Sequence, residues 1–258
     1  MRIAPLLLAL AACSHDRGRE PAPAPPASSS APEPPPPPPV HVEDLPIDGD
    51  LTAYLVRGRE HRLKMLFIPG MCVHPGGYVM AFQHTAASRG DLVTLQADVS
   101  CGGDGAARRW SSDLAAMERR IEAAFDAAEL GEPRDVVIIG YSQGAERAER
   151  LVADQRWARR ERYVAAILIA SPIEPAPRDF AHAAAVVTMA GTRDAQEKMR
   201  GAVSPLMRAG IPSEFIPLPG AAHGQMGEDP EKSMSEALDF VEEKIELGRT
   251  SHERPPRR

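Results

Sequence analysis

The sequence is poor in aromatic residues and has no excess of positive charge. Phe, Trp and Tyr make up 5% of the 258 residues, and the formal net charge at pH 7 is −6. With few aromatic rings there is little surface on which bases or sugar rings could stack. A negative net charge gives no general attraction to phosphate groups. We therefore predict that nucleic acid is not a partner of this protein.

Cysteine is also scarce, and its spacing does not match the common zinc sites. The three cysteines are Cys13, Cys72 and Cys101. Structural zinc sites need paired Cys or His ligands a few residues apart, and this sequence contains no such pair. We predict no metal site. The hydrophobic fraction of 43% is large enough for a sizeable core once the two ends are set aside.

The amino terminus has the layout of an export signal. The segment "MRIAPLLLALAAC" has one cation, Arg2, then a short apolar run and small residues before Cys13. The run is too short to cross a bilayer as a permanent helix. One interpretation of this segment is an ordinary signal peptide with an incidental cysteine.

The residues "LAAC" at 10–13 resemble the lipobox of bacterial lipoproteins. The resemblance implies a signal peptide at residues 1–12, cleavage before Cys13, and lipidation of Cys13 as a membrane anchor. It places the protein in the bacterial cell envelope, periplasmic or facing the surface. Ser14 follows where an aspartate would indicate retention in the inner membrane, so the outer membrane is favoured.

Both ends of the chain outside the predicted domain are unsuited to a packed core. Residues 13–45 contain the proline-rich stretch "APEPPPPPPV". Proline fixes φ and removes a donor, so we predict a disordered, semi-extended linker that holds a domain away from a membrane. The polar and basic residues 249–258 are predicted to be a disordered tail.

Residues 46–248 alternate between strand and helix patterns, which predicts a single α/β domain. Strands are expected at 51–57, 64–70, 91–98, 135–140, 163–170, 183–191 and 213–220. Helices are expected at 77–90, 111–131, 143–155, 194–210 (broken near Pro205) and 229–248. This alternation is typical of a mostly parallel sheet with helices on both faces. Ligands bind at the carboxyl ends of the strands in such sheets.

One strand-to-helix junction carries a G-x-S-x-G motif, Gly140-Tyr141-Ser142-Gln143-Gly144. It follows an apolar strand and opens a helix, which is the context in which this motif marks a nucleophile. A turn this sharp strains the serine and leaves no room for side chains on its neighbours, which explains the glycines. The alternative is a glycine-flanked turn with a serine that has no role.

A serine hydroxyl needs a base, and the base needs an orienting acid. His223 lies just after the last predicted strand and before the last helix. Asp194 follows the predicted strand at 183–191 and is the candidate acid, although its role could instead be to cap the next helix. Glu174 and Asp179, after an earlier strand, are rival acids. The order Ser, Asp, His along the chain is the one expected for this motif.

The segments "GYSQG", "GTRDA" and "AAHGQ", each preceded by a strand, resemble the α/β-hydrolase fold family over about residues 50 to 247. The resemblance implies an oxyanion hole formed by the backbone N–H groups of Gln143 and Met71. His74 and Tyr141 are candidate substrate contacts, and His74 could equally lie in a plain surface loop. Residues 171–184 are too few for the inserted cap domain often found there, so little or no cap is expected.

The resemblance also implies that Cys72 and Cys101 are close together. They follow two strands that are neighbours in the sheet of the family, so a disulfide is reasonable in an exported protein. Two reduced thiols are the alternative. Arg108 and Arg109, in the loop after the second of these strands, could hold a substrate carboxylate or be solvated residues at a helix start.

Together these patterns predict a serine hydrolase, with an ester as the expected substrate. Ser142 would attack the acyl carbon, His223 would take its proton and Asp194 would orient the imidazole, with no cofactor. Peptidase or acyltransferase activity on the same fold, with a peptide as a further substrate class, is one alternative. A binding lipoprotein that keeps the fold without turnover is another.

Overall fold

The computed structural model describes residues 39–103, 106–158 and 162–252. The predicted signal peptide, Cys13 and the linker up to residue 38 lie outside these ranges. Within them, no helix is both long enough and apolar enough to cross a membrane.

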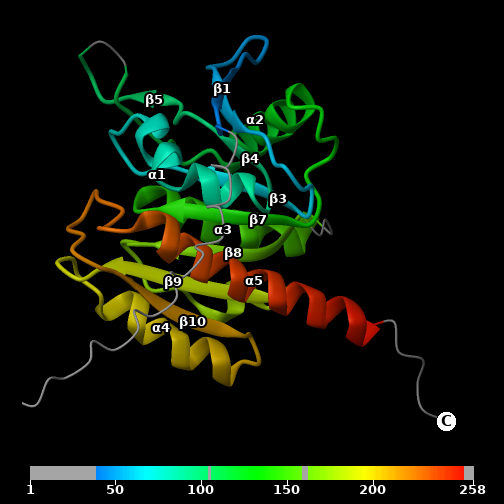
Figure 1. Cartoon of the computed structure of the whole chain (residues 1–258), viewed down its shortest axis with the longest axis vertical. Helices are drawn as coiled ribbons and strands as arrows, with labels where there is room; N and C mark the ends of the chain where they lie inside the picture. Colours follow the sequence, from blue (N-terminus) through cyan, green and yellow to red (C-terminus); the bar gives the residue numbers. More distant parts are fainter. Residues whose placement is uncertain (1–38, 104–105, 159–161, 253–258) are drawn as a thin grey trace, which may run out of the picture. The chain divides into compact units, whose positions relative to one another are not determined.

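The centre of the domain is an eight-stranded sheet with the order β1-β2-β4-β3-β7-β8-β9-β10. The strands are β1 (Val42–Leu45), β2 (Ala53–Val56), β3 (Leu63–Ile68), β4 (Gly90–Thr94), β7 (Val136–Tyr141), β8 (Tyr163–Ile169), β9 (Ala185–Gly191) and β10 (Ser213–Leu218). β2 is antiparallel to both of its neighbours, β1 and β4, and all pairs from β4 to β10 are parallel. Figure 1 shows β7 in the middle of the sheet, between β3 and β8. The predicted fold class is confirmed.

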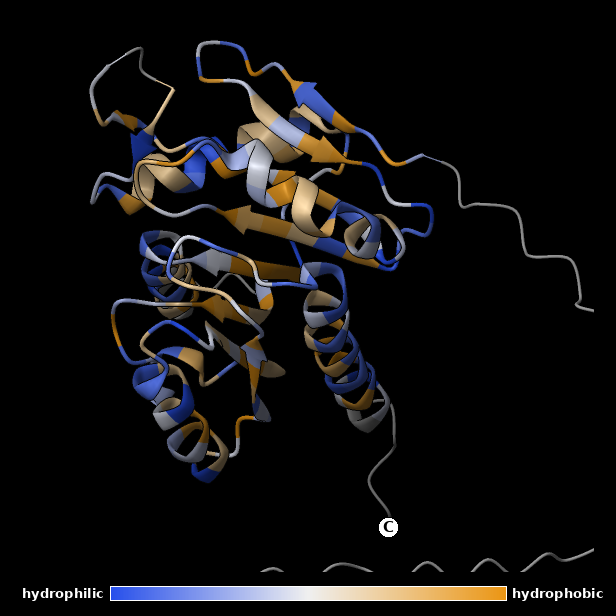
Figure 2. Cartoon of the chain, turned by 60° about the vertical axis from the view of Figure 1, so that its left-hand side comes forward, coloured by the Kyte–Doolittle hydropathy of each residue, from blue (hydrophilic) through white to orange (hydrophobic). Residues whose placement is uncertain are grey.

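Helices cover both faces of the sheet, as its apolar strands require. Helices α1 (Pro75–Ala87) and α5 (Pro230–His252) pack on one face, and α2 (Leu114–Ala127), α3 (Gln143–Ala158) and α4 (Glu197–Arg208) on the other. Strands buried on both faces read as continuous hydrophobic runs. In Figure 2 the strands are mostly hydrophobic, whereas each helix also presents hydrophilic residues.

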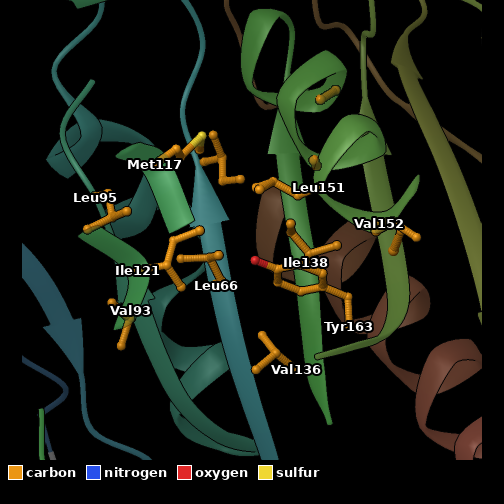
Figure 3. Close-up of a cluster of buried hydrophobic side chains, with 14 of the residues drawn as sticks. Leu66, Val93, Leu95, Met117, Ile121, Val136, Ile138, Leu151, Val152 and Tyr163 are labelled. Atoms are coloured by element: carbon orange, nitrogen blue, oxygen red, sulfur yellow. The ribbon is translucent and has the colours of Figure 1, made fainter. Parts of the chain in front are cut away.

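Alternation along each strand divides the core into two clusters. On β3, Leu66 and Ile68 face α2 and α3, whereas Met65 and Phe67 face α1 and α5, and all four are fully buried. Figure 3 shows the first cluster. Its labelled members are Leu66, Val93, Leu95, Met117, Ile121, Val136, Ile138, Leu151, Val152 and Tyr163. This packing holds the strands side by side, and the candidate site lies at their carboxyl ends.

The ends of the domain differ from the prediction. The predicted linker reached residue 45, but β1 lies inside it and pairs with β2 through Val42 and Val56. Leu45 is buried, so these residues have apolar contacts despite the proline-rich stretch before them. At the other end, α5 continues through Gly248 to His252. One glycine costs a helix only about 1 kcal/mol, which does not end it.

Two internal elements also differ. The predicted break near Pro205 is wrong, because α4 runs through it to Arg208. Ala202 and Leu206 are fully buried there, and their packing outweighs the hydrogen bond that proline removes. The prediction also missed a hairpin between β4 and α2, formed by β5 (Val99–Ser100) and β6 (Arg108–Arg109).

Candidate active site

Ser142 lies at a strained turn between β7 and α3. Its φ is +51°, a left-handed conformation that is costly for a residue with a side chain. A Cβ on Gly140 would lie 2.5 Å from Ala145 Cα, and one on Gly144 would lie 2.0 Å from the Ile68 carbonyl oxygen. Only glycine fits at these two positions, so the steric reason predicted for the motif is confirmed.

The structure brings the three predicted triad side chains into one hydrogen-bonded chain. Ser142 Oγ lies 3.0 Å from His223 Nε2, and His223 Nδ1 lies 2.8 Å from Asp194 Oδ2. A carboxylate can only accept, so Nδ1 carries the proton and donates to Asp194. Nε2 is then the lone-pair nitrogen and accepts from the Ser142 hydroxyl. This tautomer is the one that can take a proton from the serine.

Asp194, and neither of its two rivals, contacts His223. Its other oxygen accepts from the backbone N–H of Ala195 at 2.8 Å, and its side chain is 13% exposed. Glu174 lies beside Gly201 of α4, and Asp179 lies in a short 3₁₀ turn, η1 (Pro177–Phe180). A partly buried carboxylate with two hydrogen bonds is well placed to hold an imidazole in one orientation.

Two tyrosines hold the loop that carries His223. The Tyr141 hydroxyl accepts from the Gly224 N–H at 2.6 Å, and the Tyr78 hydroxyl donates to the Gly224 carbonyl at 3.0 Å. Burial raises the pKa of both phenols, so both remain neutral. Tyr141 was predicted as a substrate contact, but its side chain is 2% exposed and is used to position the histidine loop. The sequence pattern did not point to Tyr78.

The loop after β3 carries the first predicted oxyanion donor, Met71. Among the turn and loop hydrogen bonds of the described residues, neither the Met71 nor the Gln143 backbone N–H donates to a backbone carbonyl. Gly70 packs against the serine turn, because a Cβ there would lie 3.4 Å from Ser142 Cβ. Gln143 begins α3, where free N–H groups and the helix dipole favour negative charge.

A disulfide fastens this loop. Cys72 and Cys101 are bonded, with their Cα atoms 5.7 Å apart. The Cys72 N–H also donates to the Arg108 carbonyl at 2.6 Å. The Arg108 guanidinium donates to the carbonyls of Ala97 and Asp98. Arg108 therefore braces the loop, which is neither of the two roles considered for it from the sequence.

His74 uses both ring nitrogens in the fold. Nδ1 accepts from the Gly76 N–H at 3.2 Å and caps α1. Nε2 therefore carries the proton and donates to the Tyr54 hydroxyl at 2.9 Å. The ring still lines a depression of about 400 Å³, together with Tyr78 and Met226, so contact with a substrate remains a prediction.

The described part of the chain contains no group of three or more His, Cys, Asp or Glu side chains that could hold a metal ion.

No protein-family model and no curated protein sequence matches the chain, but many solved structures do. A protein from Thermoplasma acidophilum described as a predicted CIB-like hydrolase is 15% identical, with a TM-score of 0.58 over 79% of this chain and 98% of its own. An esterase from Pyrobaculum calidifontis is 12% identical, with a TM-score of 0.57 over 80% and 85%. Esterase 2 from Thermogutta terrifontis, solved phosphorylated by paraoxon, is 19% identical, with a TM-score of 0.52 over 82% and 95%. At these identities the likeness establishes the fold, and the chain has the α/β-hydrolase fold.

Proposed function

We propose that this chain, an α/β-hydrolase by fold, is a serine hydrolase that cleaves carboxylic esters through a covalent acyl-enzyme. The observation that carries the proposal is the hydrogen-bonded chain from Asp194 through His223 to Ser142. Two of the three structural neighbours named above are esterases, which supports the choice of an ester.

In the first step, Ser142 Oγ attacks the carbonyl carbon of the ester, and its proton passes to His223 Nε2. The carbonyl oxygen becomes negative and accepts hydrogen bonds from the N–H groups of Met71 and Gln143. Asp194 stabilises the charged imidazole that forms. Donors already in position cost no reorganisation at the moment of reaction, and each contributes about 10²–10³-fold in kcat.

The tetrahedral intermediate then collapses and the bond to the leaving alcohol breaks. The proton on His223 Nε2 passes to the departing oxygen, which leaves as an alcohol, and the acyl group stays on Ser142 Oγ. Water then attacks the acyl carbon, with His223 as the base. Collapse of this second intermediate releases a carboxylic acid and restores the serine hydroxyl.

The openness of the site supports a small or accessible ester. The His223 side chain is 55% exposed. The segment from 170 to 184, between β8 and β9, contains only the short turn η1, so no cap covers the serine from there. The experiment below includes amides, because a peptidase on this fold would use the same residues.

The test uses a fluorophosphonate probe and a panel of p-nitrophenyl esters and aminoacyl amides. Wild type should label and hydrolyse the esters faster than the amides. Ser142→Ala should not label, and its kcat should fall by at least about 10⁴-fold. The matched control is Ser171→Ala, which removes a buried serine after β8 and should label like wild type. Equal labelling of Ser142→Ala, or none of wild type, would overturn the proposal.

We further propose that Cys13 anchors the protein in the cell envelope through a lipid. The support is the sequence "LAAC" after a short apolar run. Cys13→Ser should move the protein from the membrane fraction to the soluble fraction, as measured by fractionation and blotting. Unchanged fractionation would show that the lipid anchor is absent.

A further inference from the structure

Trp110 connects the two segments that carry the proposed oxyanion donors. It follows β6 and is 2% exposed, so its large indole ring and the polar indole N–H are both buried in the core. Its indole N–H donates to the Pro69 carbonyl at 2.8 Å in a buried hydrogen bond. Pro69 lies two residues before Met71, at the start of the loop after β3. Trp110 is therefore bonded directly to the segment of the first donor.

The backbone of Trp110 is bonded to the second donor's own side chain. Its N–H donates to Gln143 Oε1 at 2.9 Å, and its carbonyl accepts from Gln143 Nε2 at 3.2 Å. The side-chain amide thus uses its acceptor and one donor on a single residue, which fixes its plane. Gln143 is therefore held by its side chain at the position where its backbone N–H begins α3.

The segment around Trp110 is itself fastened on both sides. The Ser111 N–H donates to Asp98 Oδ1 at 2.8 Å, and Arg147 Nε donates to the Ser111 carbonyl at 2.9 Å. Asp98 follows β4, and Arg147 lies on α3, one turn beyond Gln143. Trp110 therefore has a following residue, Ser111, that is held through both its N–H and its carbonyl, and Trp110 is itself bonded to both donor segments. A residue held in this way can set the distance between those segments.

We propose that Trp110 and the side chain of Gln143 are positioning residues, which hold the Met71 and Gln143 backbone N–H groups at the separation needed to bind one oxyanion. This inference rests on the proposed hydrolase function. It goes beyond the triad because neither side chain touches the reacting atoms. Packing alone does not require this pattern. Phe at position 110 would fill much of the same volume without the indole hydrogen bond, and Met at position 143 would do so without the two amide hydrogen bonds.

The effect should appear in kcat. Removing one oxyanion donor costs about 10²–10³-fold, and a displacement of about 1 Å in a reacting geometry can cost about 10²-fold. We therefore expect Trp110→Phe and Gln143→Met each to lower kcat by about 10–100-fold. KM for a neutral ester should change little, because the ground-state carbonyl gains little from the oxyanion hole. Both changes loosen one assembly, so the double variant should lose less than the product of the single losses.

The experiment measures kcat and KM for p-nitrophenyl acetate per active site, with sites counted by end-point fluorophosphonate labelling. Counting sites removes the contribution of misfolded protein. The affinity for a trifluoromethyl ketone, which forms an anionic adduct with a serine, should fall in parallel with kcat. Phe125→Leu, a fully buried change in the same core cluster as Trp110, is the control for lost stability. It should lower the melting temperature and leave kcat per site unchanged.

The outcomes are distinguishable. Absence of labelling and turnover in wild type would overturn the proposed function itself. An active wild type with unchanged kcat per site and unchanged ketone affinity in both variants would overturn the inference alone. Equal loss of kcat per site in Phe125→Leu would also overturn it, because the effect would then follow from stability.

Discussion

Two groups of loops meet at Ser142, and they are held in different ways. The loops after β3 and β4 are joined by a disulfide, by Arg108 and by the buried Trp110. The loops after β9 and β10 are joined by hydrogen bonds and by packing, without a disulfide, and the His223 side chain is 55% exposed. The first side is closed by a covalent bond around the buried Trp110, although Cys72 and Cys101 are themselves exposed. The second side has no disulfide, and its histidine is exposed.

The hydrogen bonds of the second side connect the loop after β9 to the loop after β10, and they use both backbone and side-chain groups. The Arg193 N–H donates to the Ala221 carbonyl at 2.9 Å, and Arg193 Nε donates to the Gly220 carbonyl at 2.7 Å. The Gly220 N–H donates to Thr192 Oγ1 at 2.8 Å. The difference matches the proposed chemistry. Fixed donors serve an oxyanion best when they do not move, whereas a base must exchange protons with a leaving group and with water.

The largest expected effect comes from a change in the loop after β9, on the second side. Asp194→Asn keeps the size of the side chain, but its amide can donate to His223 Nδ1 and so favour the wrong imidazole tautomer. We expect kcat to fall by about 10⁴-fold, with little change in the melting temperature. Ester hydrolysis and thermal unfolding measure the two. Glu174→Gln, which changes a rival acid, is the matched control, and a comparable loss of kcat there would contradict the assignment.

A smaller effect is expected from removing the disulfide of the first side, the loops after β3 and β4. Cys72 and Cys101 are separated by 29 residues, and the chain-entropy estimate for such a loop is about 3–4 kcal/mol. The double change Cys72→Ser, Cys101→Ser should lower the free energy of unfolding by about this amount, as measured by urea denaturation. It should also lower kcat per site, because Met71 adjoins the loosened residue.

Reductant provides the control for that variant. Dithiothreitol should lower the unfolding midpoint of wild type toward that of the double serine variant and leave the variant itself unchanged. If the variant and wild type respond alike, the disulfide does not fasten this side.

The smallest expected effect comes from a residue outside both groups of loops, and it is an effect on the free energy of unfolding and not on activity. Glu149 of α3 is 3% exposed; one oxygen accepts from the Ala176 N–H at 2.9 Å, and the other has no partner among the described residues. Burial, with the negative charges of Asp179 and Glu146, raises the pKa of Glu149 from 4.5 to about 7. The folded state therefore keeps a proton that the unfolded state releases. Its contribution to stability is complete below pH 4.5 and is lost as the pH rises to about 7.

Glu149→Gln removes this titration. Between pH 4.5 and 8, wild type should lose roughly 3 kcal/mol more of its unfolding free energy than the variant does, as measured by urea denaturation at each pH. Activity per site should be unchanged at pH 8. An identical pH dependence of stability in both proteins would show that Glu149 titrates normally.

The fold and the three triad candidates could be predicted because each depends on local pattern. An apolar run before Ser142, and strands before Asp194 and His223, place all three at the same edge of a parallel sheet. The glycines at 140 and 144 could be predicted from the motif, although the residue that crowds Gly144, Ile68, is distant in the sequence. The catalytic roles of these residues remain predictions for the experiments above.

What the sequence did not predict depends on contacts between distant residues. The two bonds of the Gln143 amide cross 33 positions of the chain, and the Tyr78 bond to Gly224 crosses 146. Nothing in local periodicity records such pairs. Trp110 was the available signal, because it is one of two tryptophans and lies in a loop after a strand, where a large buried ring needs a partner for its N–H.

The backbone at Ser142 has a consequence for how the protein tolerates mutation. A left-handed residue is relieved by glycine, so Ser142→Gly should leave a protein that folds at least as well as wild type. Gly144 offers no such freedom, because any side chain there collides with the Ile68 carbonyl. A mutational scan selected for folding and one selected for turnover should therefore agree at position 144 and disagree at position 142. That disagreement would mark the nucleophile without knowledge of the substrate.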